Sequence, residues 1–306
     1  MMAESEPTRG MEDLDRLLRD TSRTFALAIP LLPGELRRSV TVAYLLFRIA
    51  DTFEDSDRWS PDERIRALGD FTELLHTIDI ERANRLGRDW ATRSPVCHEG
   101  YLELLERTGQ VLEILAGLTE PVRERIVHHT GRTADRMAFF VRQTGADGQL
   151  RLASVAELRD YCYAVAGIVG EMLTDLYLLD CPALEAHAGD LRRWAPLFGE
   201  ALQLVNILRD ASADRLEGRS YVPARANREE LFALAHADLG VAREYTDALR
   251  AGGAPSGVIA FNALPIELAV ATLEVVEREG PGAKISREAV GEILLRVLGE
   301  GAADRG

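Results

Sequence analysis

Two pairs of aspartates, each at the end of an apolar helical segment, have the spacing best suited to chemistry in this sequence. Asp51 and Asp55 are four residues apart, and so are Asp210 and Asp214. Residues four apart share one face of an α-helix, which brings two like charges to about 5–6 Å from each other. Burying these charged groups beside apolar side chains would add a desolvation cost of several kcal/mol per ion. A cation bound to both carboxylates would relieve this cost.

Each pair of aspartates ends a polar stripe along its helix. In ELRRSVTVAYLLFRIADTFED the polar positions recur at i, i+4, i+7 and i+11 as Tyr44, Arg48, Asp51 and Asp55. In FGEALQLVNILRDASADRLEGRSYVP they recur at i, i+3, i+7 and i+11 as Gln203, Asn206, Asp210 and Asp214. The other positions are mostly apolar, so both helices are expected to be buried. One such pair is ordinary in an acidic chain, and it is the repetition that favours a site.

The side chains of these stripes suit a hard cation that carries an anionic substrate. Carboxylate and amide oxygens are ligands that Mg²⁺ prefers over softer donors. Mg²⁺ is usually held by one or two carboxylates and completes its octahedron with substrate phosphate. Arg209 and Arg219 lie near the second stripe, and arginine suits phosphate groups. The two stripes therefore predict a magnesium-dependent site for a phosphorylated substrate.

The elements that must position these residues are helices. Apolar residues recur at i, i+3 and i+4 in nine segments: 35–54, 62–76, 99–116, 121–143, 155–179, 192–215, 228–250, 257–279 and 286–298. Glycine and proline separate the segments, and alternating β-branched runs are scarce. The pattern predicts an all-α fold with one domain over 13–300, after a flexible N-terminus at 1–12.

The composition excludes several classes of protein. A net charge of −14 over 306 residues argues against a nucleic-acid binder and against electrostatic docking on an anionic membrane. The three cysteines form no paired framework, which favours a reducing cytoplasm. The N-terminus has no signal-peptide core, and no stretch approaches the ~20 apolar residues that span a bilayer. We expect a cytoplasmic protein with at most peripheral membrane contact, and the oligomeric state is left open.

Four motifs in order resemble those of the head-to-head prenyl synthases, the squalene/phytoene synthase family. The motifs are SRTFALAIPLLPGELRRSVTVAYLLFRIADTFED, YCYAVAGIVGEML, QLVNILRDASADRLEGRSYVP, and LPIELAVATLEVV followed by KISREAV. The likeness covers roughly residues 15–300. DTFED and the C-terminal motif resemble the squalene synthases more than the phytoene or dehydrosqualene synthases of the family.

The resemblance implies an isoprenoid-synthase-type helical bundle around a central cavity, with two allylic diphosphates and Mg²⁺ as ligands. It implies these metal ligands: Asp51, Glu54, Asp55, Asn206, Asp210 and Asp214. It implies these diphosphate-binding residues: Ser22, Arg23, Tyr44, Arg48, Gln203, Arg209 and Arg219. Phe25 matches a residue near the reacting carbons.

The second aspartate motif departs from the family pattern at one position. The family commonly has Asp-x-x-Glu-Asp there, whereas this chain has Ala213 before Asp214. The missing acid puts the metal role of Asp214 in question, and Asn206 and Asp210 remain. It also leaves open a catalytically inactive helical assembly factor of the same family.

The YCYAVAGIVGEML segment raises two further alternatives. The resemblance implies that Asp51, Asp55, Asp210 and Tyr161 act in catalysis, with Tyr161 as a proton-relay group. The alternative for Tyr161 is a core tyrosine whose hydroxyl is satisfied by a hydrogen bond. Gly167 and Gly170 make one side of this helix small. Glycine lowers helix stability by about 1 kcal/mol relative to alanine, so its presence here needs a reason. It allows either close packing of two helices or space for an isoprenoid chain.

The activity implied by the resemblance is condensation of two farnesyl diphosphates, through presqualene diphosphate, to squalene with NADPH. The chain has no dinucleotide-binding Gly-x-Gly-x-x-Gly pattern after a strand, and Lys284 and Arg287 are the candidates to contact the NADPH phosphate. Alternatively, both are surface charges beside a Gly-Pro-Gly turn. A phytoene or dehydrosqualene synthase, which needs no NADPH, is the alternative enzyme. The Asp-Asp-x-x-Asp motif of chain-elongating prenyltransferases and terpene cyclases is absent.

Overall fold

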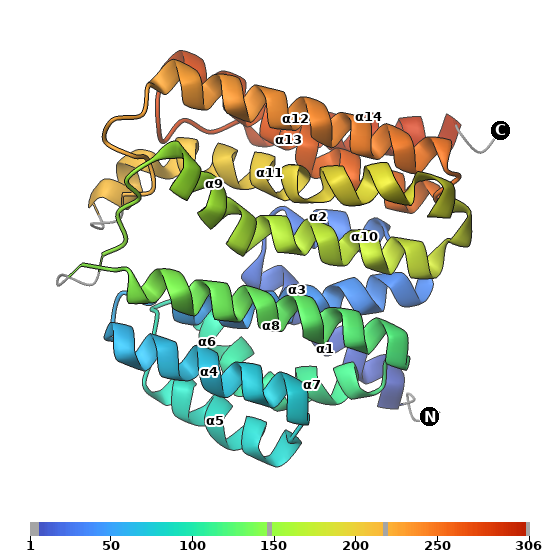
Figure 1. Ribbon diagram of the computed structural model, residues 1–306. Coiled ribbons are helices and arrows are strands. Elements are labelled where there is room, and N and C mark those ends of the chain that lie inside the picture. Colours follow the sequence, from blue (N-terminus) through green and yellow to red (C-terminus); the bar gives the residue numbers. More distant parts are fainter. Residues whose placement is uncertain (1–5, 146–148, 217–219, 304–306) are drawn as a thin grey trace. The chain divides into compact units, whose positions relative to one another are not determined.

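The computed structural model describes residues 6–145, 149–216 and 220–303 and is built of helices (Figure 1). Within these ranges the one β feature is an isolated bridge between Arg151 and Ser220. The all-α prediction is therefore confirmed. The chain divides into two compact units, Met1–Pro30 with Gly34–Arg142, and Leu31–Pro33 with Gln143–Gly306. That both units belong to one domain stays a prediction.

The first unit is organised around α3. Its helices are α1 (Glu6–Thr21), α2 (Phe25–Ala28), α3 (Gly34–Glu54), α4 (Pro61–Thr77), α5 (Ile80–Thr92), α6 (Glu99–Glu106), α7 (Thr108–Ala116) and α8 (Glu120–Arg142). Helix α3 packs against α1, α4, α6, α7 and α8, and α4 lies along α8 (Figure 1). Because it is covered by so many helices, α3 is buried over most of its length, as its apolar composition predicts.

The second unit is organised around α11. Its elements are α9 (Val155–Cys162), the π-helix η2 (Tyr163–Gly167), α10 (Ile168–Asp180), the 3₁₀ helix η3 (Pro182–His187), α11 (Ala188–Leu216), α12 (Arg228–Ala251), α13 (Ser256–Glu279) and α14 (Arg287–Ala303). Helix α11 packs against α9, η2, α10, α12 and α13, and α12 and α13 cover one another (Figure 1). A short 3₁₀ helix, η1 (Ile29–Leu31), leads from the first unit into the Leu31–Pro33 segment of the second.

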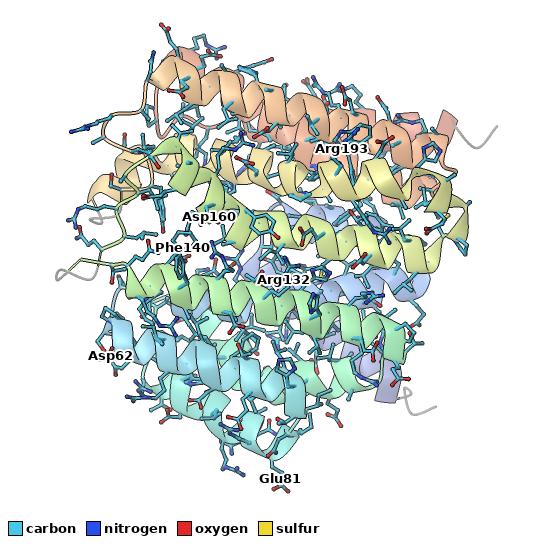
Figure 2. The ribbon with its side chains drawn as sticks, in the orientation of Figure 1. Asp62, Glu81, Arg132, Phe140, Asp160 and Arg193 are labelled. Carbon is cyan, nitrogen blue, oxygen red and sulfur yellow. The ribbon has the colours of Figure 1, made fainter. Side chains whose placement is uncertain are left out.

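Local sequence explains where several helices begin. Ser60 caps α4 through a complete capping box with Glu63, and proline follows at the first helical position. Asp62 and Glu81, both exposed, lie in the first turns of α4 and α5 and point away from the ribbon (Figure 2). Carboxylates there are stabilised by the positive end of the helix dipole. These acids therefore have a structural explanation that the aspartates of the polar stripes lack.

The structure differs from the predicted helix pattern in four places. Helix α5 was not predicted, because its buried face is carried partly by the small residues Ala83 and Gly87. The predicted 99–116 helix is two helices, α6 and α7. The predicted 155–179 helix is interrupted by the π-helix η2. Helix α1 begins at Glu6, inside the segment that we expected to be flexible.

Close helix packing accounts for the glycines near η2. A Cβ atom on Gly170 would lie 2.1 Å from the carbonyl oxygen of Ala195 in α11. A Cβ on Gly199 of α11 would lie 2.1 Å from the carbonyl oxygen of Ala166, and one on Gly167 would lie 3.3 Å from that of Pro196. Both helices therefore approach through their backbones. Of the two explanations left open by the sequence, the contacts favour helix packing at these positions.

Candidate active site

Arg48 lies at the centre of the polar stripe on α3. Its Nη1 lies 3.3 Å from the Asp51 carboxylate, and its Nη2 donates to the Tyr44 hydroxyl at 3.3 Å. The Tyr44 hydroxyl donates in turn to the carbonyl oxygen of Thr21 at 2.9 Å. The i, i+4, i+7 spacing thus brings a hydroxyl, a guanidinium and a carboxylate into one continuous group at the C-terminal half of α3.

The charged form of the Asp51 carboxyl group is disfavoured in this position. Burial raises its pKa to about 6, Asp55 raises it too, and Arg48 lowers it without cancelling the effect of burial. Asp51 and Asp55 also lie at the C-terminal end of α3, where the helix dipole is negative and no basic residue occupies the last turn. Charge at this helix end is therefore only partly compensated by the protein itself.

Burial distinguishes the three acids predicted to hold metal on α3. The Asp51 side chain is 28% exposed and Asp55 is exposed, so both are open to a ligand from solvent. Glu54 is only 5% exposed, and its carbonyl oxygen accepts a hydrogen bond from Arg64. Glu54 is thus buried, whereas Asp51 and Asp55 are open to solvent, and a metal role for all three stays a prediction.

The pair Asp51 and Asp55 fits what Mg²⁺ requires from a protein. Among the described residues there is no cluster of three or more His, Cys, Asp or Glu able to hold a metal on its own. Mg²⁺ does not need such a cluster, since one or two carboxylates with substrate phosphate and water complete its shell. A cation would also offset the burial that raises the pKa of Asp51.

Ser22 and Phe25 adjoin the same stripe. The Ser22 hydroxyl accepts a hydrogen bond from the Phe25 backbone N–H at 3.0 Å, which helps to start α2. The Phe25 ring lies 5.6 Å from that of Tyr44. Arg23 is exposed. The structure therefore connects Ser22, Phe25, Tyr44, Arg48 and Asp51 through successive contacts within the first unit.

Two residues that the sequence did not single out complete this group. The guanidinium carbon of Arg48 lies 5.6 Å from the centre of the Tyr44 ring and 5.4 Å from that of Tyr101 in α6. The exposed ring of His98 stacks on Tyr101 at 4.2 Å. No sequence spacing links α6 to α3, so only the packing of the two helices could reveal this contact.

The polar stripe on α11 lies in the second unit and changes from half-buried to exposed along the helix. Gln203 is half-buried and Asn206 is exposed. The Asp210 carboxylate is 41% exposed and accepts two hydrogen bonds from its neighbour Arg209, at 2.8 and 2.5 Å. The Asp214 side chain and all of Arg219 lie outside the described residues. That the α3 and α11 stripes act together stays a prediction.

The turn between α13 and α14 is attached to α11 beside Asp210. The backbone N–H of Gly282 donates to the carbonyl oxygen of Arg209 at 2.6 Å. Gly280 and Gly282 have φ of +95° and +91°, a conformation that favours glycine. Lys284 and Arg287 follow this turn and are exposed. Their predicted role in binding NADPH is consistent with this exposure and stays a prediction.

Tyr161 is a buried tyrosine at the end of α9. It is 3% exposed, and its ring stacks on that of Tyr221 at 4.9 Å. Tyr221 follows Ser220, whose backbone is hydrogen-bonded to Leu150 and Leu152 ahead of α9. Tyr221 was also missed as a site residue, although it lies inside the quoted GRSYVP motif. The stacking ties the second aspartate motif to the tyrosine motif within one unit.

Near Tyr161, the second unit also buries two carboxyl groups that the motifs do not include. Glu200 of α11 and Asp238 of α12 are each 5% exposed, and the guanidinium Nε of Arg159 lies 2.8 Å from Glu200. Burial and, to a smaller extent, Glu200 raise the pKa of Asp238, and Arg159 lowers it, to a net value of about 7. The pKa of Glu200 is also raised, chiefly by burial. Both carboxyl groups therefore keep a proton to a higher pH than an exposed carboxyl group does.

The raised pKa of Asp238 predicts that the folded protein loses stability as the pH rises. The folded state binds this proton more tightly than the unfolded chain, so stability falls from about pH 4 to about pH 7. A shift of about three units corresponds to at most ~4 kcal/mol. We expect Asp238→Asn to remove a decline of about 2 kcal/mol between pH 5 and pH 8, measured by urea unfolding. The exposed Asp247→Asn in the same helix is the control, and equal declines in both variants would contradict the prediction.

Contrary to the expectation from the sequence, two helical stretches are long and apolar enough to cross a membrane by composition alone. They are Val155–Asp180 and Ser256–Glu279, whose most apolar windows are 50% and 67% buried within the protein. Core helices of this length meet the same criterion. The predicted cytoplasmic location with peripheral membrane contact stays a prediction.

Comparison with known proteins matches a part of the chain that contains the first three motifs. Residues 18–231 match the family model described as squalene/phytoene synthase. The squalene synthase of Eremothecium gossypii is 31% identical over 228 residues, which cover 72% of this chain and 48% of that protein. The squalene synthase of Bos taurus is 31% identical over 218 residues, covering 68% and 45%. The chain thus spans about half the length of the curated relatives that it matches.

Solved structures of related proteins share the fold. The structure of TcSQS with the ligand BPH1237 matches with a TM-score of 0.79 and 27% identity, over 94% of this chain and 86% of that one. A dehydrosqualene synthase in complex with a ligand matches with a TM-score of 0.63 and 19% identity, over 97% and 98%, and indicates the fold alone. The family predicted from the motifs is confirmed, and the chain belongs to the squalene/phytoene synthase family.

Proposed function

We propose that the protein joins two farnesyl diphosphate molecules head to head, through presqualene diphosphate, and reduces the product to squalene. The reaction consumes one NADPH and releases two diphosphates. The names of the relatives support squalene as the product, since both curated relatives described above are squalene synthases. The motif resemblance supports farnesyl diphosphate and the need for Mg²⁺.

The observation that carries this proposal is the arrangement of Tyr44, Arg48 and Asp51 on α3. A cationic group lies beside a carboxylate whose pKa is raised to about 6 by burial, at the negative end of a helix. Such a carboxylate binds Mg²⁺ favourably, and the remaining N–H groups of Arg48 suit the oxygens of a diphosphate. The proposal assigns Asp51 and Asp55 to the metal and Arg48 to the diphosphate.

The residues of the chain have distinct roles in the proposed reaction. Bound Mg²⁺ supplies Lewis-acid stabilisation of the leaving diphosphate, and NADPH supplies the hydride of the final reduction. Arg48, Arg209 and Arg219 would bind the diphosphate oxygens as negative charge develops on them. Asn206, Asp210 and Asp214 would form the second metal group. Tyr161 would relay the proton lost when the cyclopropane ring closes, its hydroxyl oxygen accepting that proton as its own hydroxyl proton passes to released diphosphate.

The proposed substrate has an apolar prenyl chain, and the proposed product is apolar throughout. We place it in the cytoplasm, in peripheral contact with a membrane that supplies farnesyl diphosphate chains and receives squalene. Lys284 and Arg287 are proposed to contact the NADPH phosphate, because both are exposed and follow the turn that is attached to Arg209.

Product analysis tests this function directly. Purified protein is incubated with farnesyl diphosphate and Mg²⁺, with and without NADPH, and the products are separated by chromatography. We expect squalene with NADPH and presqualene diphosphate without it, and chelation of Mg²⁺ should abolish both. If dehydrosqualene forms without NADPH, the protein is a dehydrosqualene synthase and the proposed reduction is wrong. Failure to release any diphosphate would contradict enzymatic activity on this substrate.

A further inference from the structure

Arg48 is held by two aromatic rings as well as by its ion pair with Asp51 and its contact with the Tyr44 hydroxyl. Its two polar contacts, to Asp51 and to the Tyr44 hydroxyl, are both 3.3 Å long, beyond the usual 2.7–3.2 Å of a good N–H···O hydrogen bond. Its Nε is buried and has no hydrogen-bond partner among the described residues. Both ring centres lie within the ~6 Å over which a cation is attracted to an aromatic face. Its position therefore depends substantially on Tyr44 and Tyr101.

Tyr101 differs from the other groups around Arg48 because it comes from another helix. Tyr44 and Asp51 share α3 with Arg48, whereas Tyr101 belongs to the first turn of α6. The preceding residue at the start of α6, His98, makes no capping hydrogen bond with its side chain and instead stacks on the Tyr101 ring. Tyr101 is half-buried, and its ring contacts His98 at the start of α6 and Arg48 of α3, against which α6 packs.

An arginine that binds diphosphate benefits from such restraint. A free arginine side chain loses about 2 kcal/mol of rotamer entropy when it is fixed, and this loss weakens binding. A ring that already fixes the guanidinium removes part of that loss before the substrate arrives. The guanidinium carbon lies near both ring centres, and its N–H groups can still donate to oxygen acceptors of a ligand.

We infer that Tyr101 is a positioning residue, whose ring holds the Arg48 guanidinium ready to bind the diphosphate of the substrate. This inference rests on the proposed function. It assigns the effect to the ring face of Tyr101 and not to its hydroxyl. Because a positioned arginine contacts the diphosphate both before and during ionisation, Tyr101 contributes to KM more than to kcat.

The test compares Tyr101→Leu with Tyr101→Phe in the diphosphate-release assay with farnesyl diphosphate and Mg²⁺. We expect Tyr101→Leu to raise KM about 5- to 10-fold with kcat changed less than about 2-fold. Tyr101→Phe keeps the ring and should leave KM within about 2-fold of the natural protein. The matched control is Leu104→Ala, which removes a fully buried side chain from the same helix and should destabilise the protein without raising KM.

Three results would overturn the inference. An unchanged KM in Tyr101→Leu would show that Arg48 needs no help from the ring. An equal rise in Tyr101→Phe would assign the effect to the hydroxyl. An equal rise in Leu104→Ala would show that loss of stability alone is enough.

A second measurement keeps this inference separate from the proposed function. Urea unfolding of Tyr101→Leu, Arg48→Met and the double variant forms a double-mutant cycle that needs no substrate. We expect the two losses of stability to be clearly non-additive, and additive losses would refute the contact between Tyr101 and Arg48. If the natural protein releases no diphosphate, the proposed function fails while the cycle still decides whether Tyr101 positions Arg48.

Discussion

Asp51→Asn is expected to lower Mg²⁺-dependent diphosphate release from farnesyl diphosphate by about 10²- to 10³-fold. Asparagine keeps the size and one oxygen of the side chain but removes the charge that would hold the metal. Losing one group that stabilises developing negative charge typically costs this much in rate. The measurement is the initial rate of diphosphate release at saturating substrate.

The stability of this variant separates a lost ligand from a damaged fold. The partly buried carboxylate of Asp51 costs free energy in its charged form, as its raised pKa indicates. Replacing it by a neutral group should therefore change the free energy of unfolding by less than about 1 kcal/mol. Asp62→Asn is the matched control, because Asp62 is an exposed aspartate in the first turn of α4, and its rate should equal that of the natural protein. A rate within 10-fold of the natural one in Asp51→Asn would argue against a metal role.

Gly170→Ala is expected to destabilise the second unit strongly. The new Cβ would lie 2.1 Å from the carbonyl oxygen of Ala195, which belongs to the backbone and cannot rotate away. Helices α10 and α11 would have to separate, and overpacking of this kind costs about 3 kcal/mol. Urea unfolding measures the loss.

Gly240 in α12 provides the matched control for this effect. It is an exposed helical glycine, and a Cβ there would meet nothing within 4 Å. Gly240→Ala should therefore stabilise the protein by about 0.5–1 kcal/mol, because alanine loses less backbone entropy on folding. Opposite signs for the two changes are the expected outcome. Similar destabilisation by both would mean that the backbone contact of Gly170 is not what matters.

Helix positions were largely predictable from the sequence, because apolar periodicity is strong where a helix is covered on several sides. Helices α3, α8, α12 and α13 begin and end within about two residues of the predicted bounds, a normal uncertainty for helix ends. Helix α5 was not predicted, because alanine and glycine on its buried face give little apolar periodicity. Its Gly87 serves contact instead, since a Cβ there would lie 2.3 Å from the carbonyl oxygen of Leu105.

The candidate site was predictable where its residues share one helix. The spacing of Tyr44, Arg48 and Asp51 specifies a common face of α3, and their contacts in the structure follow that spacing. The spacing did not predict that Glu54 is buried while Asp51 and Asp55, on either side of it, are open to solvent. The roles of these residues in binding metal and diphosphate stay predictions.

Contacts between helices were beyond the reach of the sequence. Tyr101 meets Arg48 only because α6 packs on α3, and Glu200 and Asp238 meet only because α11 packs on α12. Periodicity reports which side of a helix is buried but not which residue of another helix it meets. The buried acid pair in particular reads in sequence as two ordinary charges on amphipathic helices.

The π-helix η2 has a consequence for how Tyr161 is aimed. Its hydrogen bonds skip one residue more than those of an α-helix, so the five residues Tyr163–Gly167 accommodate what amounts to a one-residue insertion. Each residue of an α-helix advances the chain by about 100° around the axis. Deleting Val165 would let the segment run as a continuous α-helix, but Tyr161 would then swing by roughly a quarter turn or more away from Tyr221. The orientation of that phenol is thus encoded by the length of the segment as much as by the identity of its residues.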